Sequence, residues 1–175
     1  MPLFERVAPM NDFNRTKWIR DAGFAGLAVG AVAITSILGQ IATYPNLAPW
    51  YASLAKPSFN PPNWIFAPVW TTLYALMALA LWRILRLPRK SATRRCAILL
   101  FFTLLVLNAG WSWMFFWAQS PLLGLINIGP QFAVILATIW LFAKLDAPAA
   151  ICLVPLAAWV AFAGVLNLAI WWLNG

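Results

Sequence analysis

The chain alternates between long apolar runs and short polar segments, and this alternation sets its predicted architecture. The apolar runs cover residues 22–44, 65–85, 96–118, 121–142 and 149–172. At about 1.5 Å per residue, a helix of this length crosses a hydrocarbon layer ~30 Å thick. Because a helix satisfies its own backbone hydrogen bonds, the pattern predicts an all-α membrane protein, in which residues 22–175 form one bundle of five transmembrane helices.

Residues 1–21 are polar and basic, unlike the rest of the chain. They contain four Lys and Arg, three Asp and Glu, and two prolines. We expect a short exposed leader here. No small-residue cleavage site follows a short apolar core, so the run at 22–44 is interpreted as a spanning helix and not as a signal peptide.

A segment rich in proline and aromatic residues joins the first two apolar runs. It reads WYASLAKPSFNPPNW from Trp50 to Trp64. Proline fixes φ near about −65° and restrains the residue before it. We therefore expect a stiff loop that covers whatever the helices enclose. We call this loop the lid, and the residues that we expect to form it are Trp50, Lys56, Pro57, Pro61 and Pro62.

The charged residues indicate how the helices are oriented. The chain is 63% hydrophobic with mean hydropathy +0.80, and eleven of its twelve Lys and Arg lie near or beyond the span ends on one predicted side. Only Lys56 lies on the other side. This bias favours a cytoplasmic leader and predicts a multi-pass protein of a bacterial membrane, with inner and outer membrane both open. The net charge of +8 is therefore a topology signal, and no nucleic-acid partner is expected.

Small residues in the first run form a possible helix contact. Gly26 and Gly30 have the GxxxG spacing, with Ala22 one turn earlier. Such spacing lets helix backbones approach closely. It favours packing inside the bundle, and contact between two copies in a homodimer is the alternative.

Polar and aromatic side chains recur at helical spacing within the runs, where positions three and four apart share a face. These candidate ligand-binding stripes are Ala67, Trp70 and Tyr74; Asn108, Trp111 and Phe115; Asn127 with Gln131; and Trp159, Ala163 and Asn167. Amides are costly against lipid and should face inward. Asn108 and Asn167 have two possible roles, a hydrogen bond between helices or contact with a ligand, and both stay open. For Asn127 and Gln131 we favour a hydrogen bond between helices. Tryptophans near the run ends fit an interfacial belt: Trp50, Trp140, Trp171 and Trp172.

The residue inventory excludes several kinds of chemistry. The chain has no histidine, which excludes an imidazole general base and a His-ligated metal, and its two cysteines have no metal spacing. No carboxylate or lysine lies in the middle of a run, which argues against ion-coupled transport. What remains is an apolar cavity with large π faces and a few amides, which suits a flat, largely apolar ligand and predicts no metal site.

Three motifs carry a resemblance to a known family. The lid segment, LNAGWSWMFF from Leu107 to Phe116, and LVPLAAWVAFAGVLN from Leu153 to Asn167 resemble the translocator protein family. That family is called tryptophan-rich sensory protein in bacteria and was formerly the peripheral benzodiazepine receptor. The resemblance, to a bacterial-type member, runs from the first span to the end of the chain.

The resemblance implies a five-helix bundle, often a homodimer, in which the cavity binds porphyrins. Its function would be that of a membrane receptor or sensor for tetrapyrroles, with protoporphyrin IX or haem as ligand and no required cofactor. Carried over by position, the ligand-facing residues are Trp64, Ala67, Trp70, Asn108, Trp111, Trp159, Ala163 and Asn167. The tail Asn167–Trp172 lacks the Tyr and following Arg or Lys of the sterol-associated motif, which argues against high-affinity sterol binding.

Two other functions remain open at this point. In an enzyme that degrades porphyrin in light, bound pigment would absorb the light and the resemblance points to Trp70 and Trp159 as the catalytic tryptophans. In a transporter, the bundle would move tetrapyrrole or lipid across the bilayer. We rank the transporter last, because the sequence has no inverted repeat or pair of broken helices.

Overall fold

The computed structural model describes residues 12–88 and 91–175, and within them every regular element is helical. The elements are α1 (Asp12–Leu47), η1 (Tyr51–Ser53), α2 (Asn63–Leu85), α3 (Ala92–Ser112), η2 (Trp113–Trp117), α4 (Pro121–Leu145), α5 (Ala147–Ile151) and α6 (Val154–Asn174). They form five helical units that are long and apolar enough to cross a membrane. The predicted fold class is confirmed.

The first helix is longer than the predicted span. α1 begins at Asp12, ten residues before the apolar run at 22–44, so the second half of the predicted leader is helical. No proline interrupts residues 12–44, and a polar helix end outside the hydrocarbon keeps its own backbone hydrogen bonds. Pro2, Pro9 and the rest of residues 1–11 lie outside the described part of the chain.

Two of the predicted spans depart from a continuous α-helix. The fifth is broken into α5 and α6 at Cys152 and Leu153, because Pro155 in the first turn of α6 has no N–H to continue the ladder. The third ends in η2, a π-helix, in which the N–H of Ala118 donates to the carbonyl of Trp113 at 2.9 Å. Pro68, by contrast, lies inside the unbroken α2.

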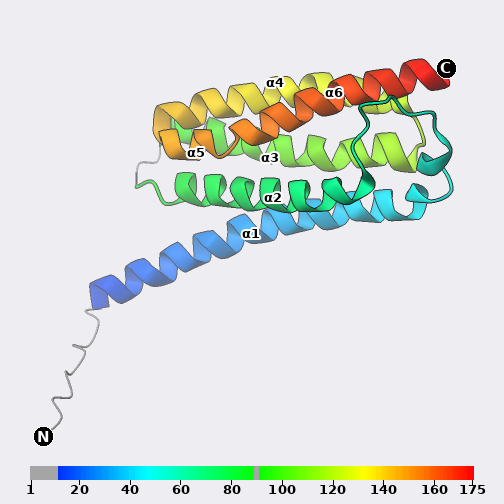
Figure 1. Cartoon of the computed structure of the whole chain (residues 1–175). Helices are drawn as coiled ribbons and strands as arrows, with labels where there is room; N and C mark the ends of the chain where they lie inside the picture. The colour runs from blue at the N-terminus through cyan, green and yellow to red at the C-terminus, as the bar shows by residue number, and fades with distance from the viewer. Residues whose placement is uncertain (1–11, 89–90) are drawn as a thin grey trace, which may run out of the picture.

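The helices close into a ring in which sequence neighbours are not always spatial neighbours. α1 packs against α2 and α3, α3 against α4, α4 against α6, and α2 against α5. Figure 1 shows the two described ends of the chain at opposite ends of the bundle, as five spans require. It also shows α1 leaning away from the other helices toward its N-terminus.

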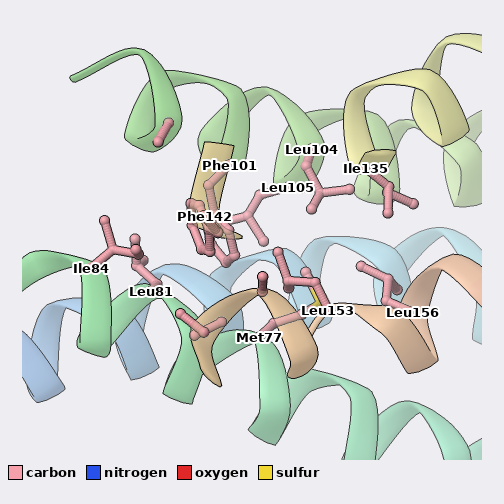
Figure 2. Packing of buried hydrophobic residues seen from close by; sticks show 14 of the residues in the cluster. Met77, Leu81, Ile84, Phe101, Leu104, Leu105, Ile135, Phe142, Leu153 and Leu156 are labelled. Atoms are coloured by element: carbon pink, nitrogen blue, oxygen red, sulfur yellow. The ribbon is translucent and has the colours of Figure 1, made fainter. Parts of the chain in front are cut away.

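The hydrophobic core fills the half of the bundle nearest the α2–α3 connection. Figure 2 shows Met77, Leu81 and Ile84 of α2 converging with side chains from α3, α4 and α6, and Phe101 stacks on Phe142 with ring centroids 5.9 Å apart. Most described Lys and Arg also lie at this basic end, where Arg83 binds the Asp146 carboxylate with two hydrogen bonds of 2.6 and 3.1 Å. Trp70, Trp111 and Trp159 pack against this core as partly buried side chains.

Gly26 and Gly30 of α1 do not pack inside the bundle. A Cβ atom added at Gly26 or Gly30 would meet nothing within 4 Å, and Gly26 is exposed. The preferred interpretation of the GxxxG spacing as internal packing is therefore wrong. Because α1 packs on α2 and α3 through its opposite face, which includes Ala28 and Val32, these glycines face outward.

Candidate ligand site beneath the lid loop

The lid loop, residues 48–62, is held in one shape by its own side chains. Tyr51 is buried and its hydroxyl hydrogen-bonds to Asn60 Oδ1 at 3.2 Å. Lys56 donates to the carbonyl of Leu54 at 3.1 Å and lies 4.6 Å from the Tyr51 ring centroid, so it stabilises the loop and does not extend into the bundle. Burial raises the pKa of the Tyr51 phenol above its usual range, which keeps this group neutral.

The proline positions explain where the lid ends. The backbone N–H of Asn60 donates to the carbonyl of Pro57 at 3.0 Å and closes a turn. Pro61 is half-buried and Pro62 is exposed. Pro62 precedes α2 with extended backbone, and its carbonyl accepts from Ile65 at 3.0 Å. The rigid exit therefore leads directly into the second span.

The lid rests on a cluster of rings at the end of the third span. Trp50 meets Phe115 edge-on with centroids 5.3 Å apart, and Tyr51 lies 5.6 Å from Phe116. Phe115 also stacks on Trp111 at 4.9 Å with an interplanar angle of 15°. Such contacts contribute about 0.5–1.5 kcal/mol each beyond area burial. The lid and the predicted stripe of the third span are thus one packed unit.

Buried amides connect four of the helices, α2, α3, α4 and α6, below this ring cluster. Asn108 Nδ2 donates to the Tyr74 hydroxyl at 3.3 Å, and its Oδ1 accepts from Gln131 Nε2 at 3.1 Å. Asn167 Oδ1 accepts from the Trp111 indole at 3.2 Å, and its Nδ2 donates to the carbonyl of Pro121 at 2.7 Å. Both amides therefore bond across helices and still lie beside the predicted tryptophans.

Asn127 differs from the other buried amides. Its Oδ1 is buried and has no hydrogen-bond partner among the described residues. Its Nδ2 lies 3.5 Å from where a Cβ would stand at Gly110. A buried acceptor without a donor is costly, so this atom is available to a donor that enters the α3–α4 interface.

Aromatic side chains span the boundary between α2 and α6. Phe66 lies 5.8 Å from Trp159, which in turn lies 5.5 Å from Phe162. One turn along α2 from Phe66, the Trp70 ring lies 5.3 Å from Tyr74. α6 packs closely on α4 and α2 on α1, so here α2 and α6 meet through rings.

The structure brings together most of the predicted site residues but not all. Trp70, Trp111, Trp159 and Ala163 are half-buried, whereas Trp64 is 73% exposed and Ala67 is also exposed. The inward face of α2 runs through Phe66, Trp70 and Tyr74 instead. Phe66 and Phe162 were missed, although the spacing of four between Phe66 and Trp70 could have identified the first.

Two surface hollows lie at the ends of the bundle. One, of about 330 Å³, opens beside the lid and is lined by residues of the lid, the α3–α4 turn and the C-terminus: Trp50, Leu54, Gln119, Ser120, Pro121, Leu122, Trp171, Asn174 and Gly175. The other lies at the basic end. Of the predicted site residues, Trp50 lies in the lining of the hollow beside the lid, and Trp70, Trp111 and Trp159 line neither hollow.

The similarity to known proteins extends over the lid, the ring cluster and the buried amides. Residues 27–173, from α1 to the end of α6, match the family described as the TspO/MBR family. This chain belongs to the TspO/MBR family. The lid, the ring cluster and the amides are therefore all parts of the TspO/MBR domain.

Relatives from bacteria, archaea and animals match over most of their length. The tryptophan-rich protein TspO of Chlorobaculum tepidum is 42% identical over 149 residues, which are 85% of this chain and 94% of the relative. The protein of the same description from Archaeoglobus fulgidus is 39% identical, over 82% of this chain and 92% of its own. The translocator protein of Bos taurus is 34% identical, over 88% of this chain and 89% of its own.

Proposed function

We propose that this TspO/MBR protein is a membrane receptor or sensor that binds tetrapyrroles, with protoporphyrin IX as ligand, in the half of the bundle beneath the lid. One observation carries the proposal. Half-buried Trp70, Trp111 and Trp159, from three different helices, all pack against the hydrophobic core, and Trp111 also packs against the rings on which the lid rests. Large π faces with a few amides suit a flat, mostly apolar ring system.

The energetics of such a site are adequate for micromolar binding. By analogy with base stacking, each aromatic plate contributes roughly 1–3 kcal/mol. Two or three plates and the exclusion of water together reach about 8 kcal/mol, which corresponds to a micromolar dissociation constant. Asn127 Oδ1, which has no hydrogen-bond partner among the described residues, offers an acceptor to a pyrrole N–H.

Binding requires the rings between α2 and α6 to separate. Phe66 and Trp159 meet edge-on across this boundary, an arrangement in which each ring can rotate about its own side-chain bonds. The hollow beside the lid provides an approach from the end of the bundle. The pigment would then replace ring–ring contacts by ring–porphyrin contacts of similar kind.

The test is a dark titration of the purified protein in detergent with protoporphyrin IX, followed by the quenching of tryptophan emission. The parent is compared with a Trp70→Phe, Trp159→Phe double variant. A Trp140→Phe, Trp172→Phe double variant is the matched control, because these side chains are 59% and 79% exposed. We expect saturable quenching in parent and control, and at least tenfold weaker binding in the first variant. Equal affinity in all three would contradict the proposed site.

Illumination of the same samples separates the binding protein from the photodegrading enzyme. If the parent and the Trp70→Phe, Trp159→Phe variant lose pigment equally at equal occupancy, the protein binds the pigment as a receptor and does not degrade it through these tryptophans. Loss in the parent alone assigns degradation to those tryptophans. Release of loaded pigment from vesicles in a protein-dependent manner would favour transport instead.

A further inference from the structure

The hollow at the basic end is a second candidate binding site, remote from the lid. It measures about 410 Å³, within the ~300–1,000 Å³ range of small-molecule sites. It lies where α1 leans away from the other helices (Figure 1). Its lining comes from α1, the end of α2 and the α4–α5 junction: Lys17, Arg20, Asp21, Arg83, Arg86, Leu87, Pro88 and Asp146.

The charges around this hollow do not balance. Four cationic side chains face two carboxylates. Arg83 is paired with Asp146, and Arg86 with Asp21 through bonds of 3.0 and 3.1 Å. Lys17 has no ion pair within the described residues, and Arg20 Nε lies 3.9 Å from Asp21 Oδ1, within ion-pair distance but beyond hydrogen-bond distance. The two positive charges in excess of the carboxylates can attract an anion.

Asp21 adds a specific hydrogen-bonding feature to the hollow. Its Oδ2 accepts from Arg86, whereas its Oδ1 is buried and accepts no hydrogen bond from the described residues. The position of Asp21 is fixed, because the Trp82 indole donates to its backbone carbonyl at 3.1 Å and Arg86 stacks on the same indole. The hollow therefore presents Lys17 and the weakly paired Arg20 beside one acceptor.

The surroundings place this hollow at the depth of lipid headgroups. The apolar run of α1 begins at Ala22, directly after Asp21, and Trp18 and Ile19 are exposed apolar side chains at the same level. Leu87 and Pro88 supply apolar lining beside the charges. A soluble anion would use the charges alone, whereas a lipid uses both the charges and the adjoining apolar surface.

We propose that this hollow binds the headgroup of an anionic phospholipid, with the phosphodiester on Lys17 and Arg20 and a headgroup hydroxyl donating to Asp21 Oδ1. Basic pockets between transmembrane helices bind anionic headgroups of this kind. The site is independent of the proposed tetrapyrrole site at the other end of the bundle. It anchors the diverging end of α1 to the rest of the bundle through a lipid.

The test counts lipids retained on the purified full chain by native mass spectrometry during titration with phosphatidylglycerol. Phosphatidylmethanol has the same charge without a hydroxyl, and phosphatidylcholine has no net charge. A Lys17→Gln, Arg20→Gln double variant removes the two cations of the hollow that make no hydrogen-bonded ion pair with a carboxylate of the described residues. An Arg15→Gln, Arg95→Gln double variant removes the same charge from exposed positions outside the hollow and is the control.

We expect phosphatidylglycerol to bind more tightly than phosphatidylmethanol, and phosphatidylcholine least. At about 1 kcal/mol per cation, the first double variant should lose about 30-fold in affinity for phosphatidylglycerol, and the control less than threefold. Equal losses in both variants would mean general surface attraction and overturn the site. Displacement by millimolar inorganic phosphate would assign it to a free anion instead. Equal binding of the two anionic lipids would overturn the contact with Asp21.

Discussion

Asn174 pairs with both backbone polar groups of Ala55, 119 residues away in the chain. Its Oδ1 accepts from the Ala55 N–H at 2.9 Å, and its Nδ2 donates to the Ala55 carbonyl at 3.0 Å. The same Nδ2 also donates to the carbonyl of Ile170 at 2.7 Å, which orients the side chain. The last turn of α6 therefore fixes the middle of the lid loop.

Replacement of Asn174 by Ala should loosen the lid. It removes two hydrogen bonds to the loop, each contributing about 0.5–1.5 kcal/mol. We expect protoporphyrin to associate and dissociate at least threefold faster in stopped-flow quenching, with little change in affinity. Leu173→Ala changes an exposed neighbour and is the control. Unchanged rates in Asn174→Ala would show that lid opening does not limit ligand entry.

Gly124 tests how closely α4 approaches the ring cluster. A Cβ at this position would lie 2.7 Å from Asn167 Oδ1 and 2.9 Å from Phe115 Cδ2, so Gly124→Ala should displace both side chains. We expect a loss of about 1–3 kcal/mol, seen as a lower unfolding temperature in detergent. Gly129→Ala on the same helix meets nothing within 4 Å and should be neutral or slightly stabilising. Equal stability of the two variants would contradict the packing described.

Replacement of the two buried asparagines of the α3–α4 interface, Asn108 and Asn127, should lower stability to different extents. Asn108→Ala leaves the Tyr74 hydroxyl and Gln131 Nε2 without a partner, whereas Asn127→Ala removes an acceptor that had none. We expect Asn108→Ala to be the more destabilising by about 1 kcal/mol in thermal unfolding. The reverse order would mean that Asn127 has a structural role that its contacts do not explain.

The absence of histidine from the chain bears on ligand choice. Haem gains affinity in many sites from an imidazole on iron, and this chain cannot supply one. We therefore expect free-base protoporphyrin to bind at least as tightly as haem in parallel titrations. Haem binding tenfold tighter would reveal another axial ligand and place the pigment outside the proposed aromatic site.

The outward-facing glycines of α1 lead us to expect a homodimer through this helix. Close approach of two backbones needs small residues, so Gly26→Leu with Gly30→Leu should shift the protein toward monomer. Gly129→Leu with Ala133→Leu introduces two leucines at the same spacing at exposed positions of α4 and is the control. Light scattering in detergent gives the mass of each. A dimer that survives the α1 change but not the α4 change would move the interface to α4.

The apolar runs predicted the five spans because membrane helices are specified by length and hydropathy, which are local properties. They did not predict that α1 continues outward to Asp12, since a polar helix end has no hydropathy signal. Partners of the buried amides depend on which helices are neighbours. Helical spacing placed Asn108 inward, but its bond to Gln131 required the α3–α4 packing to be known. For the same reason, the outward position of Trp64 was not foreseen.

The π segment at Trp113–Trp117 governs helix phase as well as lid contact. A turn closed by bonds five residues apart holds one residue more than its α-helical counterpart, so adjacent Phe115 and Phe116 both point inward. Deletion of the outward Met114 would restore an α-turn, and because one residue fewer would fill the same turn, the helix after it would keep its phase. The span would keep enough length to cross the bilayer, but consecutive side chains about 100° apart would no longer both face the lid. A single-residue change in length at this point would therefore weaken the contact between the lid and the third span in an otherwise intact bundle.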